Sequence, residues 1–221
     1  MFPRLNAWCA VFLLACSTPP PANDTPPPPT EDPQKVAISS FWSWFTAHEA
    51  EYRDLSAVAE RLDVIGAEIR RIDPGLLAEF TLDPDGTRVL VLTADGIQRL
   101  FPIVEATVAA APPIPGWRIQ ALRPAWATPD TNLQWKEQTL SFGDFYAAWD
   151  AATPANVQIY VPLPAETTEK DAATLGFVAL DAVLGEKMTE TLGELHFAGG
   201  IPPADAKNLF LLAAHLQSDK K

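Results

Sequence analysis

The stretch that decides the fold is an apolar run with a single carboxylate, Leu175-Gly176-Phe177-Val178-Ala179-Leu180-Asp181-Ala182-Val183-Leu184. A helix that is apolar nearly all round is buried in its protein. Thr168 can cap the start of such a helix, and Gly185 can end it. We therefore expect a buried helix from Thr168 to about Leu184, with a sheet packed against it.

Strand patterns lie on both sides of this helix. Residues 145–150 and 157–161 are predicted to form a hairpin, because polar and apolar residues alternate along the second of them. Residues 194–198 are predicted to form one more strand after the helix. The local order is therefore strand, strand, helix, strand.

An earlier part of the chain repeats this order. A hairpin is expected over residues 76–82 and 87–93, with a turn at the Asp-Pro-Asp-Gly sequence between them. A helix that starts near Pro102 and a strand over 116–123 follow. We infer an α+β fold in which two ββαβ units form one largely antiparallel sheet with helices on one face.

Two helices are expected before these units. Ser39 or Ser40 can cap the first helix, whose apolar face carries Phe41 and Phe45. Ser56 can cap the second, which carries apolar residues at alternating steps of three and four and ends before the Pro-Gly pair at 74–75.

The N-terminus resembles that of bacterial lipoproteins. Arg4 and the short apolar run at 7–15 indicate a signal peptide, because the run is too short for the roughly 20 residues that cross a bilayer. The segment Leu13-Leu14-Ala15-Cys16-Ser17 is similar to a lipobox. This resemblance implies cleavage before Cys16 and attachment of fatty acyl chains such as palmitate to that residue. Ser17 implies export to the outer membrane, facing the periplasm, if the host is Gram-negative.

Prolines then dominate the chain up to the folded part. Eight of the 22 prolines lie between Pro19 and Pro33. Proline fixes φ and removes a hydrogen-bond donor, which favours an extended, semi-rigid spacer. We predict a signal peptide at 1–15, a disordered Pro-rich tether at 16–36 and a single α+β globular domain at 37–221.

Charge and cysteine content exclude several classes of protein. The formal net charge of −12 argues against nucleic-acid binding, which requires cations opposite the phosphates. The chain has two cysteines: Cys9 lies in the signal peptide, and Cys16 is the predicted lipidation site. We therefore expect neither a disulfide nor thiol chemistry in the mature domain.

Several short motifs together are similar to an uncharacterised family of bacterial α/β proteins. The resemblance spans most of residues 37–221, and it implies no activity, cofactor or catalytic residue. The motifs are Phe41-Trp42-x-Trp44-Phe45, Ala94-Asp95-Gly96, Phe101-Pro102, Ala110-Ala111-Pro112, Gly116-Trp117, Arg123-Pro124 and Leu180-Asp181-x-x-Leu184-Gly185-Glu186.

The sequence lacks the common catalytic motifs. It contains no H-E-x-x-H, no G-x-S-x-G and no Walker loop. The three histidines, His48, His196 and His215, fall in three different predicted elements, so we expect no metal site and no cofactor. Core packing is the expected role of Trp117, Trp126, Trp135 and Trp149, which would also suffice for an aromatic ligand groove.

Asp181 is the most informative polar residue because it interrupts the apolar helix. A buried carboxylate requires partners or a raised pKa. Asp181, Glu186 and His196 are the candidate catalytic group, in the roles of acid, base and orienter. The alternative, which we favour, is that Asp181 accepts hydrogen bonds from a loop or from an arginine such as Arg123 and stabilises the fold.

Three functions remain open at this point. The first is a lipid-anchored cell-envelope protein with a non-catalytic domain that binds another protein, such as an envelope protein, or another component of the envelope. The second is a hydrolase-like enzyme that uses an acidic and histidine-containing pocket, and the third is an immunity lipoprotein that blocks a toxin. We expect the chain not to be an enzyme, and we expect its membrane contact to be made by the N-terminal lipid.

Overall fold

The computed structural model describes residues 32–54, 58–83, 85–150 and 156–218. Contacts between residues place Asp32–Lys221 in one compact body. The predicted lipobox, with Cys16, the tether up to residue 31 and the predicted cap Ser56 lie outside the described residues. No helix in the described part of the chain is long and apolar enough to cross a membrane.

The first helix, α1 (Pro33–His48), begins earlier than the sequence analysis predicted. The Asp32 side chain accepts a hydrogen bond from Gln34 N at 3.0 Å, and proline occupies the first turn. Proline fits there because its fixed φ is helical and its missing N–H would have no partner. The cap is therefore Asp32 rather than Ser39 or Ser40, and residues 33–36 belong to the helix rather than to the tether.

A short 3-10 turn, η1 (Glu49–Tyr52), follows α1, and another, η2 (Val58–Arg61), leads into α2 (Leu62–Ile69). The N-terminal unit then contains β1 (Leu77–Leu82), β2 (Arg88–Thr93), η3 (Gln98–Leu100), α3 (Phe101–Ala109) and β3 (Trp117–Ala121). Strand β2 is central, antiparallel to β1 and parallel to β3.

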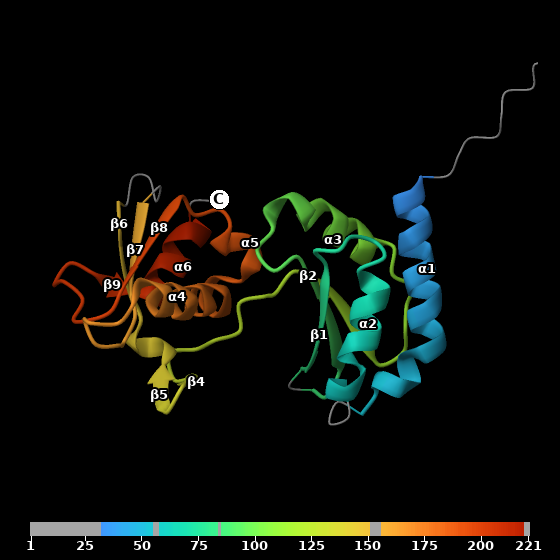
Figure 1. The fold of residues 1–221 in the computed structure, drawn as a ribbon, viewed down its shortest axis with the longest axis horizontal. Coiled ribbons are helices and arrows are strands. Elements are labelled where there is room, and N and C mark those ends of the chain that lie inside the picture. Colours follow the sequence, from blue (N-terminus) through green and yellow to red (C-terminus); the bar gives the residue numbers. More distant parts are fainter. Residues whose placement is uncertain (1–31, 55–57, 84, 151–155, 219–221) are drawn as a thin grey trace, which may run out of the picture. The chain divides into compact units, whose positions relative to one another are not determined.

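One core joins the helices of this unit to one face of its sheet. Leu90 and Leu92 of β2 are fully buried and belong to the same cluster as side chains of α1, α2 and α3. Trp42 of α1 donates its indole N–H to the carbonyl of Thr107 in α3 at 2.7 Å. The apolar face of α1 and the residues Ile65 and Ile69 of α2 thus pack on the sheet of the first ββαβ unit (Figure 1), whereas Leu62 at the start of α2 is exposed.

A two-stranded hairpin, β4 (Asn132–Trp135) with β5 (Gln138–Ser141), separates the two units. After the 3-10 turn η4 (Phe142–Asp144), the C-terminal unit contains β6 (Tyr146–Trp149), β7 (Asn156–Tyr160), α4 (Glu169–Leu184), α5 (Glu186–Thr189) and β8 (Glu194–Ala198). The described chain then adds β9 (Lys207–Asn208) and α6 (Leu209–Ser218).

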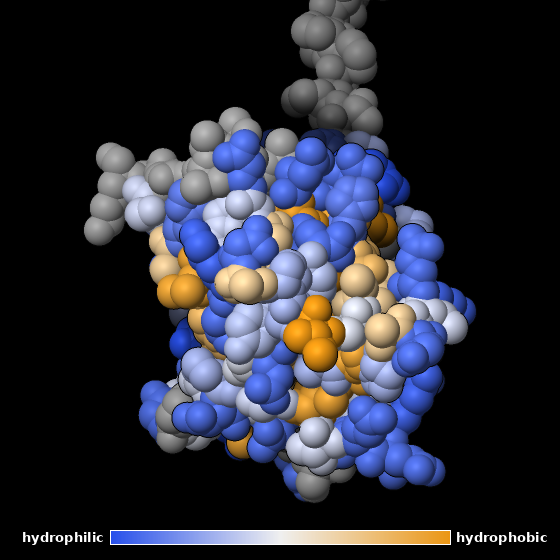
Figure 2. Space-filling view, turned by 90° about the vertical axis from the view of Figure 1, so that its left-hand side faces the viewer, coloured by the Kyte–Doolittle hydropathy of each residue, from blue (hydrophilic) through white to orange (hydrophobic). Residues whose placement is uncertain are grey.

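The sheet of the C-terminal unit has the order β8-β7-β6-β9, with β7 antiparallel to β6 and parallel to β8. Val157 and Ile159 of β7 are fully buried in a core that includes α4 and α6. Figure 2 shows the side of the molecule that lies on the left in Figure 1. There, hydrophilic side chains divide the hydrophobic surface into separate patches.

The α+β class, the two ββαβ units and the two N-terminal helices predicted from the sequence are confirmed. The expectation that both units share one sheet is wrong, since their strands belong to separate sheets. The central strand β2 is paired on both edges, with β1 and β3, and β6 is paired on both edges, with β7 and the short strand β9. Each unit therefore completes a sheet of its own.

The helix start at Pro33 generates a test. Asp32→Ala is expected to lower the free energy of unfolding by about 1 kcal/mol, because an N-terminal amide of α1 loses its acceptor. Ser39→Ala is the matched control: Ser39 is exposed inside the helix, so alanine should leave stability unchanged or raise it by up to about 0.5 kcal/mol. Urea unfolding measures both, and the reverse order would contradict a cap at Asp32.

Candidate functional site

A buried carboxylate joins the two ββαβ units. Glu186 is the first residue of α5, directly after Gly185, and it is 0% exposed. A carboxylate with no solvent contact needs hydrogen bonds to its oxygens, because its desolvation is otherwise very unfavourable. The N-terminal unit and the segment that follows it supply these bonds.

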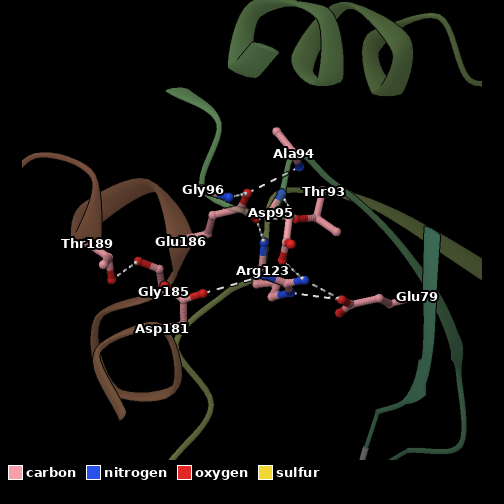
Figure 3. A network of polar contacts seen from close by, with 10 residues as sticks. All are labelled: Glu79, Thr93, Ala94, Asp95, Gly96, Arg123, Asp181, Gly185, Glu186 and Thr189. Carbon is pink, nitrogen blue, oxygen red and sulfur yellow. Dashed lines mark hydrogen bonds and ion pairs between the residues drawn. The ribbon is translucent and has the colours of Figure 1, made fainter. Parts of the chain in front are cut away.

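Four donors surround the Glu186 side chain (Figure 3). Oε1 accepts from the amides of Ala94 at 3.2 Å and Gly96 at 3.0 Å. Oε2 accepts from the Thr93 hydroxyl at 2.6 Å and from the Arg123 amide at 3.0 Å. Hydrogen bonds to a charged acceptor are about twice as strong as neutral ones, so this residue is a major link between the units.

The loop after β2 has a backbone conformation that directs several amides toward the Glu186 carboxylate. Asp95 and Gly96 both have positive φ, 50° and 77°. Left-handed residues in a turn direct neighbouring amides toward one point and create an anion-binding concavity. Here the anion is a side chain of the same protein.

The backbone of Gly185 and Glu186 lies close to the backbone of residues 123–125. The Glu186 amide donates to the Arg123 carbonyl at 3.0 Å, so these two residues are paired in both directions. Gly185 has φ of 80°, and a Cβ there would lie 2.8 Å from the Ala125 nitrogen. Glycine is needed at 185 both for its conformation and for this close approach.

Arg123 extends the network from the buried carboxylate to the surface. Its guanidinium contacts Glu79 at 2.7 Å, Asp95 at 2.9 Å and Asp181 at 3.5 Å. Burial lowers the pKa of Arg123, but the hydrogen bonds that its guanidinium donates to Glu79 and Asp95 outweigh this effect and hold the pKa above its usual value.

Asp181 lies in α4, one turn before the helix ends. Burial raises the pKa of Asp181, the charge of Arg123 and the Thr189 hydroxyl oppose this, and the charges of Glu186 and Asp95 add to the rise. The ion pair with Arg123 is the arrangement that the sequence analysis favoured over catalysis.

The structure brings together only two of the three candidate catalytic residues. Asp181 contacts the Arg123 guanidinium and Glu186 accepts from the Arg123 amide, whereas His196 lies on β8 between Leu195 and Phe197. Those two neighbours pack on the core that includes α4, so alternation along the strand directs His196 to the opposite face of the sheet. His196 is half exposed, 3.7 Å from Glu194. The predicted group of acid, base and orienter is therefore not formed.

A groove of about 570 Å³ lies above this network. Its charged lining residues are Asp95, Arg123, Asp181 and Glu190, and its apolar lining residues include Trp126, Phe177 and Val178. Trp126 is 59% exposed and Phe177 is 46% exposed. The prediction that α4 is buried all round is therefore wrong, because the helix packs on its own sheet with one side and presents Phe177 and Val178 to solvent.

Sequence reasoning missed Glu190. The carboxylate of this partly buried residue has no hydrogen-bond or ion-pair partner among the residues that the structure describes. Burial, followed by the charges of Asp181 and Glu186, raises its pKa. The four-residue spacing between Glu186 and Glu190 was an available signal, because it places two carboxylates on one side of a helical turn.

No protein-family model matches this chain, and no curated protein matches it.

Because four donors bind its carboxylate, replacement of Glu186 is expected to destabilise the fold strongly. Glu186→Ala leaves its donors unpaired and should lower the free energy of unfolding by about 3–5 kcal/mol. Glu186→Gln should lower the free energy of unfolding by at least about 2 kcal/mol, because the NH₂ group of the glutamine would face N–H donors.

The matched control is Glu190→Gln, which removes a carboxylate that accepts no hydrogen bond from any described residue and should change stability by less than about 0.5 kcal/mol. Urea denaturation of the full chain measures all three variants. Equal effects at positions 186 and 190 would contradict the structural role assigned to Glu186.

Proposed function

We propose that this chain is a lipid-anchored cell-envelope protein whose folded part is a non-catalytic binding module. The observation that carries the proposal is the groove, where aromatic side chains of Trp126 and Phe177 are exposed beside a polar network. Exposed aromatic residues that line a concavity are typical of binding sites. The proposed ligand is a segment of another envelope protein.

The contacts of Asp181 and Glu186 favour binding over acid–base catalysis by these two residues. A general acid or base must reach the proton that it transfers. Both oxygens of Glu186 accept hydrogen bonds inside the protein, and Asp181 faces the Arg123 guanidinium. These contacts support a structural role for both carboxylates, which hold the groove in one shape.

The proposed lipid anchor is supported by sequence features. The lipobox-like segment that ends at Cys16 and Ser17 supports lipidation, and the Pro-rich segment after it supports a spacer between the membrane and the folded part. A single acyl chain holds a protein only weakly at a membrane, whereas two or more hold it stably.

Lipidation can be tested with the two cysteines. In cells labelled with radioactive palmitate, the wild-type chain should incorporate label and sediment with membranes, and Cys16→Ser should lose the label. Cys9→Ser is the control, since Cys9 lies before the predicted cleavage site and its loss should leave labelling intact. Unchanged labelling of Cys16→Ser would rule out this anchor, and mass spectrometry of the mature N-terminus would identify the modified residue.

Binding at the groove can be tested by photo-cross-linking in cells. A benzoylphenylalanine side chain in place of Phe177 should form a defined adduct with an envelope protein on irradiation. The same side chain in place of Leu211, an apolar residue of α6 that is 54% exposed outside the groove, is the control and should form no such adduct. No adduct from position 177, or an identical adduct from position 211, would contradict a binding role for the groove.

A further inference from the structure

We propose that the groove recognises a lysine or arginine side chain that is flanked by apolar residues in a segment of the partner protein. This inference deepens the proposed function and rests on it. It assigns the chemical class of the ligand from the charges and the aromatic surfaces that line the groove.

The groove has an excess of negative charge. Asp95, Asp181 and Glu190 line it, and Arg123 is the one cation among its lining residues within the described part of the chain. Arg123 is already engaged by Asp95 and Asp181 and, outside the groove lining, by Glu79. An anionic ligand would have to compete with these carboxylates, so charge complementarity favours a cationic ligand.

A cationic ligand would provide a partner for the Glu190 carboxylate. No donor in the described residues contacts its carboxylate, although the side chain is partly buried and close to other carboxylates. Desolvation and the charges of Asp181 and Glu186 raise the pKa of Glu190, which means that its ionised form lacks compensation. An ammonium or guanidinium group would provide both a charge and hydrogen bonds.

The aromatic residues suit the rest of such a ligand. The ring of Phe177 packs against Phe197 at 4.8 Å between centroids, and the ring of Trp126 packs edge-on against Phe142 at 5.6 Å. The amides of residues 126 and 127 both bind the Ala182 carbonyl, which positions the segment that carries Trp126. These rings can contact the methylene stem of a basic side chain, its cation and an adjacent apolar residue.

A peptide titration tests this assignment with the purified full chain. The probe is the blocked nonapeptide Gly-Ser-Ala-Leu-Lys-Phe-Ala-Ser-Gly, and the comparison peptides carry norleucine or glutamate in place of lysine. Isothermal titration calorimetry at low salt and pH 7.5 should show about tenfold weaker binding of the norleucine peptide, because an ion pair and a cation–π contact are lost. The glutamate peptide should show no binding.

Variants of the chain locate the interaction. Glu190→Gln and Phe177→Ala should each weaken binding of the lysine peptide at least about fivefold. Asp205→Asn and Leu211→Ala are the matched controls, since both residues are exposed and lie outside the groove, and they should bind like the wild type. Affinity for the lysine peptide should fall as the pH is lowered, beginning above the usual carboxyl range, because the pKa values of Asp181 and Glu190 are raised.

The outcomes separate this inference from the proposed function. Equal affinity for the lysine and norleucine peptides, tighter binding of the glutamate peptide, or no binding of any peptide would overturn the assignment of a cationic ligand. The binding module would still stand if cross-linking from position 177 yields its adduct. Failure of that cross-linking would overturn the proposed function itself.

Discussion

The contact on which the rest of the structure depends is the insertion of the Glu186 carboxylate into the loop at residues 93–96. Burial of a carboxylate is unfavourable unless its oxygens are hydrogen-bonded, and here four donors meet them. Three of these donors belong to the loop that ends β2, and the fourth is the amide of Arg123. Polar contacts centred on Glu186, rather than a shared sheet, consequently hold the two ββαβ units together.

This contact also explains where the candidate site lies. Because Glu186 brings the end of α4 against Arg123 and the loop after β2, side chains from both units converge there (Figure 3). Several of them line the groove. Asp95 comes from one unit, Asp181 and Glu190 come from the other, and Arg123 connects them. The groove is therefore polar where Asp95, Arg123 and Asp181 line it, and apolar where α4 exposes Phe177.

Much of the fold could be predicted from the sequence because it depends on local patterns. The alternation in residues 157–161, the turn residues at 83–86 and Gly185 as a helix stop reflect backbone preferences that neighbours along the chain impose. The predicted helix start failed at Ser39 because Asp32 and Pro33 form an equally good local signal. The predicted single sheet failed because the pairing of strands that lie far apart in the sequence has no local signature.

The sequence by itself determined the α+β class, the two repeated units, and the importance of Asp181 and Glu186, because an isolated carboxylate in or beside an apolar helix must find partners. It also carries the lipobox-like segment at Cys16, which is a linear signal. Only the tertiary structure decided which partners those carboxylates find and that His196 faces away from them. The donors to Glu186 are mainly backbone amides, which every residue except proline has, so their convergence depends on φ angles and chain packing that residue identities do not encode locally.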